Sequence, residues 1–129
     1  MQRKFLITGA ILGLIAVLFG AFAAHGLKDL LSVESIATFE TGVKFQMYHA
    51  LLFLILGSLE SQLKKLNNLI FFMFLSGIIL FSGSIYLLAT NSLYAFDAAK
   101  IAMLTPLGGT ILITGWGMLI WRFIKLKSK

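Results

Sequence analysis

Ten polar side chains interrupt a sequence that is otherwise strongly apolar, and their types could support three kinds of chemistry. Histidine is a general base and a haem ligand, serine is a nucleophile, and an acid four residues before a lysine favours a helical ion pair. No metal site is expected, because the chain has no Cys and no acidic cluster. The ten candidates are His25, Glu40, Lys44, Gln46, Tyr48, His49, Ser82, Ser84, Tyr86 and Thr105.

The composition defines the surroundings in which these side chains must work. The chain has 129 residues, 59% of them hydrophobic and 12% charged, and its mean hydropathy is +0.95. Soluble domains average about 45–50% apolar and about 25% charged residues. The excess of apolar residues excludes disorder and a solvated surface over most of the chain. The length leaves no room for a second globular domain.

Four stretches are candidates for membrane-spanning helices. A helix rises 1.5 Å per residue, so about 20 apolar residues cross a hydrocarbon core about 30 Å thick. Three stretches meet this requirement, and a fourth does so only if it starts near Thr38, which brings Glu40 and Lys44 to the edge of the bilayer. We therefore expect an all-α integral membrane four-helix bundle in one domain, residues 1–129, with spans at about 5–24, 38–59, 68–90 and 101–122.

The distribution of Lys and Arg predicts the orientation of this bundle. Eight of the eleven lie in the N-terminal segment, the segment after the second span and the C-terminal tail. The positive-inside rule then predicts a cell membrane protein with both termini in the cytoplasm. The C-terminal Lys cluster is interpreted as an orientation signal rather than a nucleic-acid or anionic-lipid patch, so no nucleic-acid partner is expected.

Small residues recur on one face of the first span and at seven-residue spacing in the third and fourth spans. Such spacing lets helix backbones approach closely in lipid, so we expect these strips to face inward. They comprise Gly9, Gly13, Ala16, Gly20 and Ala24, then Gly77 with Ser84, and Gly108 with Gly115.

The first outer loop, from His25 to about Ala37, is long enough for a short interfacial helix capped by Ser32 or Ser35. His25 is expected to cap the first span, with Gly26 as its terminator.

Thr105-Pro106 leaves two alternatives for the fourth span. The span starts at Thr105, whose hydroxyl caps it, or a short outer helix over residues 97–104 breaks there and the span resumes.

Counting residues from the cytoplasmic ends gathers the polar side chains in the outer half of the bilayer. His49 lies about 16 Å up and Gln46 about 21 Å up. At 100° per residue, Glu40, Lys44 and Tyr48 share one face of the second span, and Gln46 and His49 lie on roughly the opposite face. Neither face suits lipid, so we expect one to face the bundle interior and the other a neighbouring subunit of a homo-oligomer.

Two of these features have a structural and a functional interpretation. Glu40 and Lys44 form either an interfacial pair that sets the helix end, or a buried pair that guards a polar pathway or binds a lipid headgroup. His49 is either a packing residue held in one tautomer by a neighbouring hydroxyl or carbonyl, or a proton relay or ligand contact.

Four motifs occur together in this order and spacing. They are Gly20–Leu27 (GAFAAHGL), Phe45–Ala50 (FQMYHA), Leu80–Tyr86 (LFSGSIY), and Thr105–Gly109 (TPLGG) with Gly115-Trp116. Together they resemble the small bacterial membrane proteins catalogued as domain of unknown function 423, which have similar small proteins in eukaryotes. The resemblance covers almost the whole chain and implies a four-pass integral membrane protein. It brings no activity, so no catalytic residue is carried over.

Three functions are weighed for the outer polar layer. The first and favoured one is non-enzymatic: a small transporter, channel or accessory subunit that binds a lipid headgroup, a small solute or a partner helix, without a cofactor. The second is a redox subunit with haem between His25 and His49, which depth counting opposes because the two lie about 14 Å apart along the membrane normal. The third is a lipid-acting enzyme with His49 or His25 as base and Ser82 or Ser84 as nucleophile.

Overall fold

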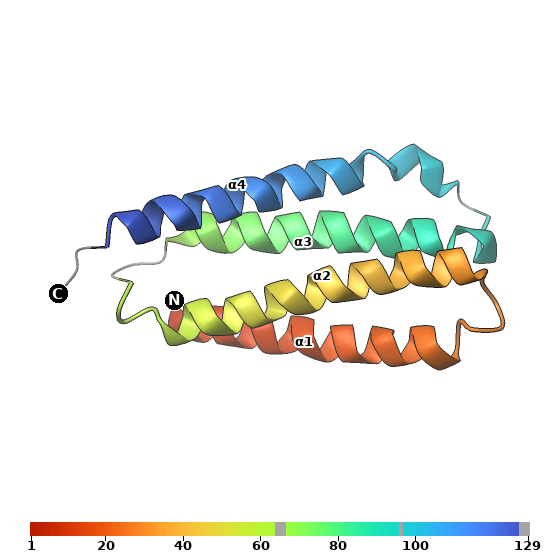
Figure 1. Cartoon of the computed structure of the whole chain (residues 1–129), viewed down its shortest axis with the longest axis horizontal. Coiled ribbons are helices and arrows are strands. Elements are labelled where there is room, and N and C mark those ends of the chain that lie inside the picture. Colours follow the sequence, from red (N-terminus) through yellow and green to blue (C-terminus); the bar gives the residue numbers. More distant parts are fainter. Residues whose placement is uncertain (64–66, 96, 127–129) are drawn as a thin grey trace.

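The computed structural model describes residues 1–63, 67–95 and 97–126, and the regular structure in these ranges is helical. Four long helices lie side by side along a common direction (Figure 1). Two 3-10 turns, Asn91–Leu93 and Ala98–Ile101, lie between the third and fourth. The prediction of an all-α chain is therefore confirmed. The helices are α1 (Gln2–His25), α2 (Val33–Ser58), α3 (Asn68–Ala89) and α4 (Leu104–Ile124).

Side-chain caps determine where α2 and α3 begin. The Ser32 hydroxyl accepts the N–H of Ser35 at 3.1 Å, and the side-chain Oδ1 of Asn67 accepts the N–H of Ile70 at 3.2 Å. Such caps satisfy N–H groups that the first helical turn leaves free. Residues 26–32 form turns, so the predicted short interfacial helix is wrong. Its residues from Val33 onward belong to α2 itself, which begins one turn earlier than the sequence predicts.

The start of α4 decides between the two alternatives for Thr105. The helix begins at Leu104, so Pro106 lies in the first turn, where its missing N–H removes no helical bond. No side chain caps this helix, and the Thr105 hydroxyl instead lies 2.5 Å from the Ser84 hydroxyl. The cap prediction is therefore wrong. A 3-10 turn, capped by the Asp97 carboxylate on the N–H of Ala99 at 3.0 Å, stands in the region of the predicted outer helix.

The helices pack in sequence, with α2 and α3 as the inner pair. α1 packs on α2 and α4 packs on α3. Rings also join α1 to α3, where Phe19 and Tyr86 lie 5.0 Å apart, and α2 to α4, where His49 and Trp116 lie 6.2 Å apart. We call the end where α1 begins and α4 ends the terminal end, and the end with residues 26–32, 90–95 and 97–103 the loop end (Figure 1).

A phenylalanine-rich core lies toward the terminal end. The Phe5 ring of α1 is fully buried, with its centroid 5.6 Å from that of Phe53 in α2 and 5.1 Å from that of Phe71 in α3. Leu112 and Leu119 of α4 complete this cluster. A smaller cluster at the loop end joins α1, α2 and α3 and comprises Ala23, Leu27, Phe39 and Ala89.

Small residues allow the closest helix contacts, as the sequence predicts. A Cβ on Gly9 would lie 2.8 Å from the Ala50 carbonyl oxygen of α2, and one on Gly108 would lie 2.5 Å from the Phe81 nitrogen of α3. Ala16 is buried, whereas Ala24 is exposed, so the strip on α1 stops before Ala24. Close backbone approach is therefore built into both the α1–α2 and the α3–α4 interfaces.

Three segments are long and apolar enough to cross a membrane, namely α1, α3 and Ala99–Ile124. α2 has 26 residues, or about 39 Å of helix, but it falls outside this group. The polar and charged side chains of its first half lower its hydropathy. Glu40 and Lys44 lie in that half, and Gln46, Tyr48 and His49 follow in the next turn.

Candidate functional site

Gln46 joins three helices near the middle of the molecule. Its side-chain amide donates to the Leu12 carbonyl of α1 at 2.8 Å, and its amide oxygen accepts the Tyr86 hydroxyl of α3 at 2.6 Å. Gln46 is 5% exposed. A buried amide with its donor and acceptor both engaged avoids the desolvation cost of unpaired polar groups. One side chain of α2 thus fixes the positions of both neighbouring helices.

Two buried serines of α3 add contacts to α2 and to α4. The Ser82 hydroxyl donates to the Gly42 carbonyl of α2 at 2.7 Å. Ser84 shares a 2.5 Å hydrogen bond with Thr105 of α4 and donates to the Phe81 carbonyl at 3.0 Å. Gly42 also lets the Tyr86 ring lie against α2, because a Cβ there would lie 2.7 Å from that ring.

His49 connects α2 to α4 and is held in one tautomer. Its Nε2 lies 3.3 Å from the Trp116 indole nitrogen, and its Nδ1 lies 2.7 Å from the Phe45 carbonyl oxygen. The indole N–H is only a donor and the carbonyl is only an acceptor. The arrangement therefore requires a neutral ring that carries its proton on Nδ1. Of the two interpretations of His49, the geometry matches the tautomer-fixed packing residue.

We call these hydrogen-bonded side chains the polar network: Gln46, His49, Ser82, Ser84, Tyr86, Thr105 and Trp116. Within the described parts of the chain, no buried side-chain nitrogen or oxygen lacks a hydrogen-bond partner. The network is therefore closed within the protein, and it links all four helices.

The catalytic arrangement considered for a lipid-acting enzyme is not assembled. Acyl transfer needs a nucleophile and a base within hydrogen-bond reach of one another. Ser82 and Ser84 bond to carbonyls and to Thr105, while His49 bonds to Trp116 and Phe45. The described residues thus give neither serine a histidine partner.

His25 also differs from its predicted role. Its side chain is exposed, and α1 closes through the backbone N–H groups of Gly26 and Leu27, which bond to the Phe22 carbonyl. Gly26 has φ −70°, so it is not the left-handed terminator that the sequence suggested. His25 and His49 do not fit the role of axial haem ligands, because both ring nitrogens of His49 are engaged within the protein.

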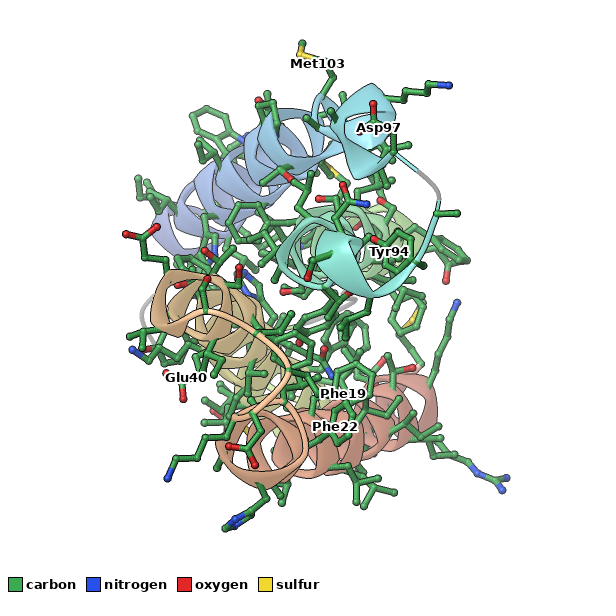
Figure 2. All side chains as sticks on the ribbon, turned by 90° about the vertical axis from the view of Figure 1, so that its right-hand side faces the viewer. Phe19, Phe22, Glu40, Tyr94, Asp97 and Met103 are labelled. Atoms are coloured by element: carbon green, nitrogen blue, oxygen red, sulfur yellow. The ribbon has the colours of Figure 1, made fainter. Side chains whose placement is uncertain are left out.

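The two faces of α2 have different surroundings. Gln46 and His49 are buried against the other helices, whereas Glu40, Lys44 and Tyr48 are exposed. Figure 2 shows Glu40 on the outer side of α2. Among the described residues, Glu40 and Lys44 form no ion pair, so neither the interfacial nor the buried pair is present within the chain, and both charges lie on one exposed helix face.

Sequence reasoning missed two partners in the network. The Leu12 carbonyl is a backbone group, so no side-chain pattern identifies it as the acceptor for Gln46. In the sequence, Trp116 appears only as part of a motif. The signal that could have identified it is chemical: an indole N–H within a membrane span needs an acceptor, and His49 is one of the few side-chain acceptors in the spans.

Two grooves reach the network from outside. One, of about 200 Å³, lies between α1 and α3 and is lined by Gln46, Ser82 and Tyr86. The other, of about 220 Å³, lies between α2 and α4 and is lined by His49 and Trp116. Apart from these polar side chains, both are lined by apolar residues and glycine.

The fold and the three spans define a small, all-helical integral membrane protein. The profile of the family described as Protein of unknown function (DUF423) matches residues 19–109, and the chain belongs to this family. It is 36% identical to the UPF0382 membrane protein of Haemophilus influenzae over 99% of both chains.

Two further relatives agree with this assignment. The UPF0382 membrane protein YwdK of Bacillus subtilis is 36% identical, over 96% of this chain and 98% of its own. The UPF0382 inner membrane protein YgdD of Escherichia coli is 35% identical, over 99% of this chain and 95% of its own. No solved structure shows a significant match.

Proposed function

We propose that this protein is a non-enzymatic, four-pass assembly or accessory subunit of the cell membrane, and that it forms a homo-oligomer through the exposed face of α2. The observation that carries the proposal is the contrast between the two faces of that helix. The polar side chains on the inner face are bonded within the protein, and the charged ones on the outer face have no partner among the described residues.

α2 is the fourth crossing in this proposal. Its length of about 39 Å exceeds a hydrocarbon core of about 30 Å, so its first turns, with Glu34, reach the outer interface. Four crossings bring both termini to the same side of the membrane. The excess of Lys and Arg in the terminal segments favours the cytoplasm for that side.

The closed network favours an assembly role over a transporter or channel. A transport site presents polar groups to its solute, and a channel presents them to water. Here the side chains of Gln46, His49 and Ser82 form hydrogen bonds with other helices of the same chain. Such bonds in lipid fix helix register, which suits a rigid scaffold.

The exposed face of α2 favours a second copy of the chain as its partner. Glu40 and Lys44 have opposite charges and lie one helical turn apart. Around a twofold axis along the membrane normal, Glu40 of each copy would meet Lys44 of the other. Ionisable side chains in membrane helices are paired far more often than they face lipid.

Cysteine cross-linking tests this interface in a favourable background, since the chain has no native Cys. We expect Tyr48→Cys in isolated membranes to give a covalent dimer on mild oxidation, because a disulfide requires Cα atoms within about 7 Å. Leu14→Cys, on the exposed face of α1, is the matched control and should remain monomeric. Equal cross-linking of both variants would count against the α2 interface.

Charge reversal tests the pairing itself. Glu40→Lys alone and Lys44→Glu alone each bring like charges together and should lower the dimer fraction. Co-expression of the two variants restores both cross pairs, so mixed dimers should form preferentially. When one of the two variants carries an additional affinity tag, native mass spectrometry of mild-detergent extracts separates the three species by mass. A statistical mixture would contradict the proposal.

A further inference from the structure

A groove lies between α3 and α4 at the terminal end, away from the polar network. It encloses about 510 Å³. Its apolar lining includes Ile70 of α3 and Met118 of α4. Gly117 forms part of its wall, and a Cβ added there meets nothing within 4 Å, so the groove is open at that point.

Positive charge and hydrogen-bond donors gather at one end of this groove. Arg122 lines it and is half-buried, and within the described residues it forms no hydrogen bond or ion pair. The Lys125 ammonium lies 4.3 Å from the centre of the Trp121 ring, which also lines the groove. Asn67, at the start of α3, adds a side-chain amide. The described lining contains no acidic side chain.

We propose that this groove binds one anionic phospholipid, with its phosphate on Arg122 and an acyl chain along Ile70, Gly117 and Met118. A guanidinium presents a planar fork of donors that matches two phosphate oxygens. Trp121 lies beside it, at the depth where indole rings favour the interface between headgroups and hydrocarbon. An apolar channel ending in an unpaired cation fits an amphiphile with a negative headgroup. A free anion would leave the apolar part of the groove empty.

This inference does not depend on the homo-oligomer. The groove lies on α3 and α4, whereas the proposed interface lies on α2. Failure of either test therefore leaves the other result interpretable.

The experiment is a lipid titration of the full chain in mild detergent, followed by native mass spectrometry. The probes are phosphatidylglycerol and phosphatidylcholine with identical acyl chains. We expect one phosphatidylglycerol per chain, bound about tenfold more tightly than phosphatidylcholine. Both lipids carry the phosphate, but the choline cation of phosphatidylcholine cancels the charge of its headgroup and is repelled by Arg122. Equal binding of the two lipids would overturn the proposal.

Two pairs of variants test whether the lipid binds in this groove, and the first pair removes a positive charge. Arg122→Gln should lower phosphatidylglycerol affinity about tenfold, to the level of phosphatidylcholine. Arg3→Gln removes the same charge from the same end of the molecule but outside the groove, and should change affinity less than twofold. An equal loss in both variants would assign the effect to net charge and overturn the site.

The second pair tests whether an acyl chain occupies the groove, by filling the space beside Gly117. Gly117→Leu should abolish stoichiometric binding of both lipids. Gly83→Leu, at the other glycine with open space around its Cβ, should leave binding unchanged. Circular dichroism checks that both variants keep the helical content of the parent. Unchanged binding in Gly117→Leu, or full displacement of the lipid by millimolar inorganic phosphate, would contradict a lipid site.

Discussion

The terminal end and the middle of the helical array are held together by different interactions. At the terminal end, rings such as Phe5, Phe53 and Phe71 interlock, while in the middle the helices are joined by hydrogen bonds of Gln46 and Ser82. Lipid chains are as apolar as a protein core, so ring packing gains little from leaving the solvent, and its contribution comes from shape. Hydrogen bonds have no substitute in lipid. The terminal end therefore sets how tightly the helices pack, and the polar network sets their register.

The largest effect is expected where shape alone holds the helices. Phe5→Ala removes a fully buried ring from the terminal core and should lower the free energy of unfolding by about 3 kcal/mol. Titration with SDS, followed by far-UV circular dichroism, measures this quantity. Phe5→Leu, which preserves most of the volume, should cost less than about 1.5 kcal/mol.

Phe123→Ala is the control for this prediction, because that ring is 44% exposed near the same end of the molecule. Its effect should stay within about 0.5 kcal/mol. If Phe5→Ala were no more costly than Phe123→Ala, packing at the terminal end would not determine stability.

The next effect concerns the closest backbone contact between α3 and α4. Gly108→Ala places a Cβ 2.5 Å from the Phe81 nitrogen, so α4 must move away, at a cost of about 2 kcal/mol. Gly83→Ala adds the same methyl group in open space and should be neutral within about 0.5 kcal/mol. The same SDS titration compares the two. A neutral Gly108→Ala would mean that the helices separate there without loss.

A smaller effect is expected at the centre of the polar network. Gln46→Leu leaves the Tyr86 hydroxyl without its acceptor and should cost about 1.5 kcal/mol, while membrane insertion stays intact. Tyr86→Phe removes the other partner. The double variant should then be less destabilised than the sum of the two by about 0.6 kcal/mol, the average coupling for such bonds in membranes. Strict additivity would show that the two side chains do not interact.

The sequence predicted the helical class and the inward strips of glycine because both follow from local composition and spacing. It also separated the two faces of α2, since the angle between Gln46 and Tyr48 follows from helix geometry alone. It failed where the outcome depends on a partner distant in sequence. One of the two alternatives for the fourth span has Thr105 as the cap of α4, but its hydroxyl bonds to the Ser84 hydroxyl on α3 instead. The extra turn of α2 was missed because Ser32 could cap either a short helix or α2 itself.

The smallest effect on stability is expected at the hydrogen bond between Trp116 and His49. Trp116→Phe removes the donor to His49 but keeps an aromatic ring against Phe74, so it should cost only about 0.6 kcal/mol. Nitrogen NMR of labelled histidine in detergent micelles is more sensitive than stability here. His49 should show a protonated Nδ1 and an unprotonated, hydrogen-bonded Nε2, and in Trp116→Phe only the Nε2 resonance should shift strongly. Trp121→Phe is the matched control, since that indole does not reach His49. If Nδ1 shifted instead, the assigned tautomer would be wrong, and the link between α2 and α4 would rest on ring packing as it does at the terminal end.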